Sequence, residues 1–146
     1  MNRRIMWVVL AVVPLATAAG WTDSRPIALA ELPVAAMQLI SPDDYREASA
    51  LAARGGAALE AALKVVGTFE GSAQQIIQVN DAGEAPSTSR VTVLRDGLLD
   101  DSVRGDRWEV SLERTAARLW RIREVKRAWR CRRGGQTDSF ATLRCP

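Results

Sequence analysis

Apolar and polar residues alternate with two different periods along this chain, and the period changes near residue 68. Between residues 41 and 66, apolar or small residues recur at spacings of three and four, which places them on one side of a helix. Ser41 suits the N-cap, Pro42 the first helical position and Gly67 the C-terminal stop. The pattern predicts one long helix, in which a glycine on the apolar stripe allows close backbone approach or a kink. The stripe consists of Tyr45, Ala48, Ala52, Gly55, Leu59, Ala62 and Val66.

After residue 68 the alternation has a period of two, which is typical of half-buried antiparallel strands. In residues 106–114, Trp108, Val110 and Leu112 face one side, and charged or hydroxyl side chains face the other. The remaining strand-like runs and turn signals lie at 71–80, 80–83, 90–95 and 96–97.

Residues 115–130 fit both periods. As a helix they would be basic and amphipathic, which would suggest a membrane surface. As a strand they need a bulge near residues 123–124, so that the apolar residues change phase there. We favour the strand, because a short turn at 115–118 makes it the hairpin partner of 107–114. The helical stripe would be Leu119, Ile122, Val125 and Trp129, whereas the strand phases would be Trp120 and Ile122, then Val125, Trp129 and Cys131.

The first 19 residues have the layout of a secretory signal peptide. Arg3 and Arg4 precede an apolar run from residue 5 to residue 16, and small residues follow it. The run is shorter than the ~20 apolar residues of a membrane-spanning helix. We therefore expect cleavage near residues 18–20, no stable membrane insertion afterwards, and a periplasmic or secreted protein.

These patterns predict a signal peptide over 1–19, an extended lead-in over 20–40 and a single α+β domain over 41–146. One long N-terminal helix packs on a curved antiparallel sheet, with a disulfide at the C-terminus. About 126 mature residues suffice for one hydrophobic core. The lead-in is expected to pack its apolar side chains onto the domain; they are Ile27, Leu29, Val34, Met37 and Leu39.

Cys131 and Cys145 are the two cysteines of the chain. In an exported protein they are expected to form a disulfide, and closing a ~15-residue loop is worth about 3 kcal/mol in the chain-entropy model. A redox pair would favour a C-x-x-C spacing, and a metal site would need more ligands.

The chain has no histidine, which excludes several enzyme classes. Neither a Ser-His-Asp triad, a Cys-His pair nor a histidine-based zinc site can form. Carboxylate chemistry stays open, since Glu109 and Glu113 lie on one side of a predicted strand. Without a recognisable motif, we expect no enzyme activity, no metal and no cofactor.

The charge is divided unevenly along the chain. Residues 20–102 hold 6 Lys/Arg and 12 Asp/Glu, a net charge of −6, whereas residues 103–146 hold 12 and 5, a net charge of +7. Two interpretations stay open: the two halves attract each other within one fold, or the basic half meets an anionic partner.

Arginine and tryptophan alternate in the basic half. Tryptophans that face inward would be core, whereas tryptophans exposed beside arginine would hold an anionic polymer or a protein partner by stacking and charge. Nucleic acid is not expected for an exported protein. The candidate ligand-binding residues are Arg107, Trp120, Arg121, Arg123, Arg127, Trp129 and Arg130.

Four oxygen-bearing side chains cluster before this region. Asp96, Asp100, Asp101 and Ser102 could supply calcium ligands, but their spacing is not that of an EF-hand. We interpret the cluster as an acidic turn, since aspartate is a preferred turn residue.

Several of these motifs together resemble a group of small exported bacterial proteins of unknown function. They are DGLLDDSV at residues 96–103, Trp120-x-Ile122, and an Arg-Cys…Gly-Gly…Cys run that carries Phe140 before its last cysteine. The order of elements is also similar to cystatin-like or NTF2-like α+β rolls. The resemblance covers about the last 50 residues and implies no activity.

The sequence thus predicts an exported, non-enzymatic binding module of the cell envelope whose basic half engages an anionic ligand. A protein-binding or inhibitor-type domain and a carboxylate-dependent hydrolase are the alternatives. No oligomeric state follows from the sequence.

Overall fold

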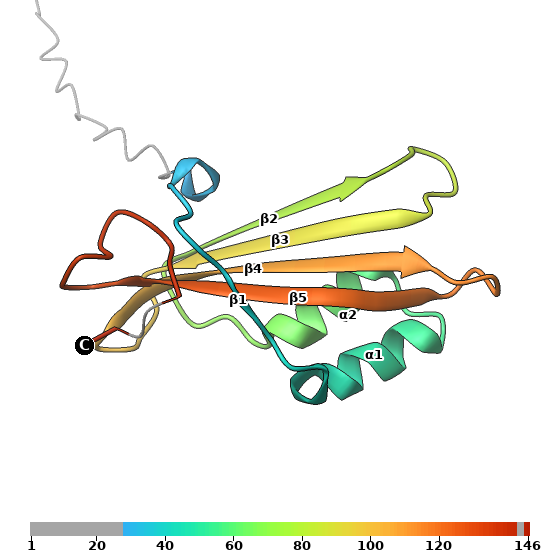
Figure 1. The fold of residues 1–146 in the computed structure, drawn as a ribbon, viewed down its shortest axis with the longest axis horizontal. Coiled ribbons are helices and arrows are strands. Elements are labelled where there is room, and N and C mark those ends of the chain that lie inside the picture. Colours follow the sequence, from blue (N-terminus) through green and yellow to red (C-terminus); the bar gives the residue numbers. More distant parts are fainter. Residues whose placement is uncertain (1–27, 143–144) are drawn as a thin grey trace, which may run out of the picture.

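A computed structural model describes residues 28–142 and 145–146, and its centre is a five-stranded antiparallel sheet (Figure 1). The strand order across the sheet is β1-β5-β4-β3-β2. The predicted α+β class and antiparallel sheet are confirmed, whereas the expected signal peptide lies outside the described residues. The strands are β1 Gln38–Leu39, β2 Ala73–Asn80, β3 Thr88–Asp96, β4 Val103–Arg114 and β5 Trp120–Cys131.

The prediction of one long helix over residues 41–66 is wrong. The segment forms a 3-10 turn, η2 (Pro42–Tyr45), followed by two short helices, α1 (Arg46–Ala53) and α2 (Ala58–Val66). Gly55 lies between the helices with a φ of 98°, a backbone conformation that residues with a side chain rarely adopt. Gly55 is exposed and does not belong to a buried stripe. Its conformational freedom ends the helical run rather than bringing two backbones together.

Most of the apolar stripe survives this break, because both helices turn their small residues toward the same side of the sheet. Figure 1 shows α1 and α2 side by side beneath β3, β4 and β5. Gly67 ends α2 with a φ of 77°, and its N–H donates to the carbonyl of Leu63, as the sequence predicts. The helical segment contributes seven buried residues to the main hydrophobic core of the protein: Tyr45, Ala48, Ala52, Ala58, Ala61, Ala62 and Val66.

The sheet side that carries the helices, called the helix face below, holds the main core. Trp108, Val110 and Leu112 of β4 all face it, which confirms the predicted alternation of this strand. Its other buried members are Val91, Val93, Trp120, Ile122 and Val125.

Strand β5 resolves the ambiguity of residues 115–130 in favour of a strand. It pairs with β4, and its register shifts between Ser111 and Leu112 of that neighbour, which places the extra residue at Arg123. Ile122 and Val125 are three residues apart, so in a regular strand they would face opposite sides. The extra residue of the bulge brings both side chains to the helix face. The hairpin turn at 115–118 is also present: the N–H of Arg118 donates to the carbonyl of Thr115.

The opposite side of the sheet, called the open face below, is covered at one end only. There the lead-in, with its 3-10 turn η1 (Leu29–Glu31), and the C-terminal loop pack over Leu94 and Ala128. Leu29 and Phe140 are buried in this second cluster, and Met37 packs against it.

The lead-in packs only in part as predicted. Val34 and Leu39 stay 38% and 62% exposed, and Ile27 lies outside the described residues. The lead-in also supplies the edge strand β1, which the sequence pattern does not indicate.

Candidate functional site

Arg107, Arg121 and Arg123 lie on the open face, and each is paired with a carboxylate. Arg107 donates to Glu109 at 2.8 Å within β4. Arg121 and Arg123 of β5 both pair with Glu113 of β4. Arg121 and Arg123 keep about 60% of their side chains exposed (60% and 59%), so they remain accessible to a ligand.

The next candidate pair, Arg127 and Trp129, lies on the helix face beside a buried carboxylate. Asp106 is 0% exposed and accepts from Arg127 at 2.8 Å. It also accepts two hydrogen bonds from Arg95, at 2.7 and 2.6 Å, and one from the indole of Trp108 at 2.9 Å. The guanidinium of Arg127 lies over the rings of Trp108 and Trp129, at 4.4 and 5.0 Å from the ring centres. These residues form a structural cluster around Asp106.

The last two candidates, Arg130 and Trp120, are buried. Arg130 is 3% exposed and binds Asp96 of β3, on the open face beneath the covering loops. Trp120 is 7% exposed and belongs to the main core, with Arg114 lying 4.6 Å over its ring. The seven candidate residues therefore do not form one surface.

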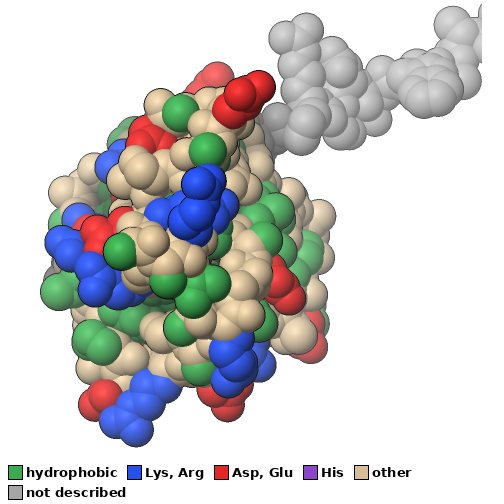
Figure 2. Space-filling view, turned by 90° about the vertical axis from the view of Figure 1, so that its right-hand side faces the viewer, with side chains coloured by type: hydrophobic (Ala, Val, Ile, Leu, Met, Phe, Trp, Pro, Cys, Tyr) green, Lys and Arg blue, Asp and Glu red, His purple; other side chains and the backbone are tan. Residues whose placement is uncertain are grey.

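Some of the charges pair across the two halves of the chain, and others pair within one half. Arg95 and Asp96 of the acidic half bind Asp106 and Arg130 of the basic half. Four of the five carboxylates of residues 103–146 also pair with arginine or lysine; they are Asp106, Glu109, Glu113 and Glu124. Figure 2 shows the end with the hairpin turns, where blue and red side chains are interspersed without a continuous basic patch. The pair Arg130–Asp96 is an attraction between the two halves, whereas the pairs within residues 103–146 leave the net charge of that half unchanged.

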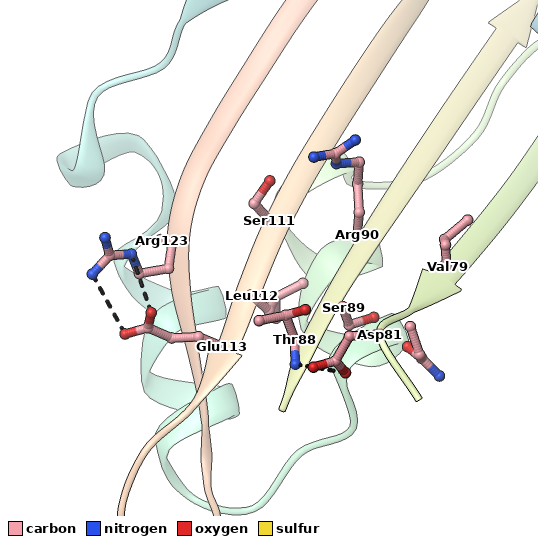
Figure 3. A pocket seen from close by; sticks show the side chains of 10 residues that line it. Val79, Asp81, Thr88, Ser89, Arg90, Ser111, Leu112, Glu113 and Arg123 are labelled. Atoms are coloured by element: carbon pink, nitrogen blue, oxygen red, sulfur yellow. Dashed lines mark hydrogen bonds and ion pairs between the residues drawn. The ribbon is translucent and has the colours of Figure 1, made fainter. Parts of the chain in front are cut away.

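One hollow on the open face contains an arginine that is not paired with a carboxylate. It has a volume of about 550 Å³, within the range of small-ligand pockets, and is formed by residues from β2, β3, β4 and β5. Arg90 of β3 is exposed there and has no hydrogen bond or ion pair to any described residue. Figure 3 shows Arg90, Ser111 and Arg123 on three neighbouring strands around it. This hollow is the candidate site.

The acidic groups at the rim of the hollow are held in the ionised form. Hydrogen bonds from Ser87 and Thr88 lower the pKa of Asp81 below its ordinary value. The guanidinium of Arg121, and then that of Arg123, lowers the pKa of Glu113 in the same way. Since both carboxylates already have internal partners, Arg90 is left as a charged group of the hollow with no described partner, which a ligand can neutralise.

The geometry does not favour the hydrolase alternative. Glu109 and Glu113 share the open face, but four residues along a strand span about 13 Å. Paired catalytic carboxylates of glycosidases lie roughly 5 to 9.5 Å apart. The lowered pKa of Glu113 also makes it a poor proton donor near neutral pH.

The acidic cluster at residues 96–102 fits the turn interpretation. Asp100 accepts from the backbone N–H groups of Ser102 and Val103, at 2.8 and 2.6 Å, which lowers its pKa. Asp96 is buried against Arg130 and is not available to an ion. Among the described residues no group of three acidic or cysteine side chains could hold a metal.

The predicted disulfide between Cys131 and Cys145 is confirmed, with a Cα–Cα distance of 5.3 Å. It ties the C-terminus to the end of β5, where Cys131 is 2% exposed. The loop that it closes carries Phe140, so it helps to hold that ring over the covered end of the open face.

Comparison with known proteins adds nothing to this picture: no family model, no curated protein and no solved structure matches the chain. None of the helices in the part of the chain that the structure describes has the length and apolar character needed to span a membrane.

Sequence reasoning missed both Arg90 and Asp106. The alternation of residues 90–95 places Arg90 opposite Val91 and Val93, so its exposure on the outer side of the sheet could have been inferred. Nothing in the sequence indicates that it lacks an acidic neighbour, because its neighbours come from other strands.

Proposed function

We propose that the chain is an exported, non-enzymatic binding module that holds a small anionic ligand in the hollow of the open face. The observation that carries the proposal is Arg90, an exposed guanidinium without an internal partner inside a pocket of ligand size. A carboxylate or phosphate group is the chemistry that a free guanidinium binds best.

The residues around Arg90 support the same ligand class. Arg123 lines the hollow with its side chain 59% exposed, so it can offer a donor to the ligand while it keeps Glu113. Thr88 and Ser111 add hydroxyl groups that donate or accept. In this proposal Arg90 binds the anion, Arg123 assists it, and the hydroxyls select among anions by hydrogen bonding.

The proposal moves the site away from part of the predicted surface. Arg130 and Trp120 are buried, and Arg127 and Trp129 belong to the cluster around Asp106. Arg107 and Arg121 lie on the open face near the hollow and contribute to its potential, although they do not line it.

The experiment is calorimetric titration of the oxidised chain with inorganic phosphate and with citrate, at about 50 and about 500 mM salt. Replacing Arg90 with glutamine should weaken binding roughly ten- to a hundredfold, the usual value of a charge-assisted hydrogen bond. The matched control is Arg133→Gln, which removes the same charge from an exposed position in the disulfide loop.

Unchanged binding by the Arg90→Gln chain would overturn the site. Equal weakening by both variants would mean that net charge, rather than the hollow, attracts the anion. Absence of binding of either probe at low salt would remove the small-anion ligand class from the proposal.

Export has its own test. A disulfide is typical of an oxidising compartment, which supports secretion to the periplasm or beyond. The mass of the chain recovered after export should correspond to cleavage near residues 18–20, with one disulfide. Recovery of the intact N-terminus would contradict the signal peptide.

A further inference from the structure

The outer edge of β2 is unusually well suited to pairing with another strand. β2 pairs with β3 over all eight of its residues, and on its other side no described residue forms a strand. From residue 73 to residue 80 it contains neither a charged residue nor a proline, which are the common means of protecting an edge. Ile76 and Val79 are 40% and 61% exposed there.

The opposite edge of the sheet is different. β1 is only two residues long, and Pro33 and Pro42 flank it a few residues away on each side. A short edge strand offers few free backbone groups, so it does not template another chain. Within the part of the chain that the structure describes, one edge of the sheet is therefore protected and the other is available.

The hydrogen-bond alternation shows which backbone groups are free. The N–H of Asp81 donates to the carbonyl of Thr88, one step beyond the last pair of the β2–β3 ladder. In an antiparallel ladder every second residue points to the same neighbour, so the odd-numbered residues of β2 bind β3. The N–H and C=O groups of Gln74, Ile76 and Gln78 consequently point outward.

We propose that two copies of the chain pair through their β2 edges and form a two-fold symmetric dimer with one continuous ten-stranded sheet. Antiparallel pairing of identical strands places the two-fold axis perpendicular to the sheet, so the helices of both copies lie on one face. The two hollows then share the other face and stay open.

The absence of charged side chains on β2 favours a second copy of the chain as the partner. Around a two-fold axis each side chain of β2 meets residues of the same strand, so a charge there would meet a like charge and oppose pairing. β2 carries none. Its glutamine side chains can instead pair with each other across the axis by amide hydrogen bonds. Since each copy has one available edge, assembly stops at two rather than growing into a fibre.

The first test is light scattering coupled to size-exclusion chromatography, and it should give twice the mass of one chain. Gln74→Lys combined with Gln78→Lys should raise the dissociation constant at least about tenfold, because like charges face each other across the axis. The matched control adds the same two charges in the exposed β4–β5 turn, as Ala116→Lys with Ala117→Lys.

Mixing the lysine pair with the corresponding Gln74→Glu, Gln78→Glu chain should restore a dimer that contains one copy of each. An unaltered chain that is monomeric at all concentrations would overturn the proposal. A dimer that is as stable with Gln74→Lys and Gln78→Lys as with the two control lysines would also overturn it.

Amide exchange gives an independent test without substitutions. Dimer formation should slow exchange at residues 74, 76 and 78 as the protein concentration rises, whereas residues 75, 77 and 79 are protected at every concentration. Concentration-dependent protection elsewhere, with none at the even positions, would assign the contact to another surface.

Discussion

Replacing Asp106 with asparagine tests how much the cluster around Asp106 contributes to the stability of the fold. Asp106 is fully buried and accepts four hydrogen bonds, three of them from Arg95 and Arg127. Asparagine has nearly the same shape but removes the negative charge and places an amide donor opposite a guanidinium. Arg95, with 8% of its side chain exposed, would then be a buried cation without a counter-charge.

The expected loss is about 3–5 kcal/mol of unfolding free energy, the usual cost of removing one partner of a buried ion pair. That is a large share of the roughly 5–15 kcal/mol that stabilises a domain. The assay is urea unfolding followed by far-UV circular dichroism, because tryptophan emission itself responds to the lost Trp108 contact. Asp138→Asn, at an exposed position, is the control and should change stability by less than about 0.5 kcal/mol.

A double substitution tests the reasoning behind this number. Arg95→Met with Asp106→Leu removes both charges and should cost less than either single change, because no unpaired charge remains buried. Arg127 keeps 28% of its side chain exposed and can turn to water. A loss below about 1 kcal/mol for Asp106→Asn, or strictly additive costs in the double variant, would refute the account.

Three further predictions concern the disulfide, the rim of the hollow and the backbone beside the cluster. Replacing Cys131 and Cys145 with serine should lower the unfolding free energy by about 3 kcal/mol, measured by urea denaturation. The pKa of Glu113 is lowered from 4.5, so its stabilisation is complete above that pH and is lost as the pH falls through the lower folded pKa. Glu113→Gln should therefore flatten the stability profile in that acid range, measured by denaturation at a series of pH values. Gly105→Ala should cost about 1–3 kcal/mol, because its Cβ would overlap the carbonyl oxygen of Arg95, whereas Gly83→Ala meets nothing and should be neutral in thermal unfolding.

Local patterns were sufficient for the strands and for much of the core. The two-residue period of β4 identified Trp108, Val110 and Leu112 as its buried side, since successive side chains of a strand point to opposite faces. The same logic, with one bulge, made residues 120–131 a strand. The pairing of Cys131 with Cys145 also followed, because two cysteines have one possible connectivity.

The helical segment shows the limit of that reasoning. A spacing of three and four places residues on one side but does not say whether the helix between them is continuous. The two adjacent glycines permit a reversal that lets α1 and α2 pack against each other.

The sequence by itself determined the α+β class, the buried faces of the strands and the disulfide, because these depend on periodicity and on residue type. Only the tertiary structure decided which arginines are free. Arg130 is matched by Asp96 and Arg95 by Asp106, partners 34 and 11 residues away that the strand register brings together. The residues directly opposite Arg90 are Val79 and Ser111, and neither carries a carboxylate. Ion pairing across strands depends on register, and register is a property of the whole sheet.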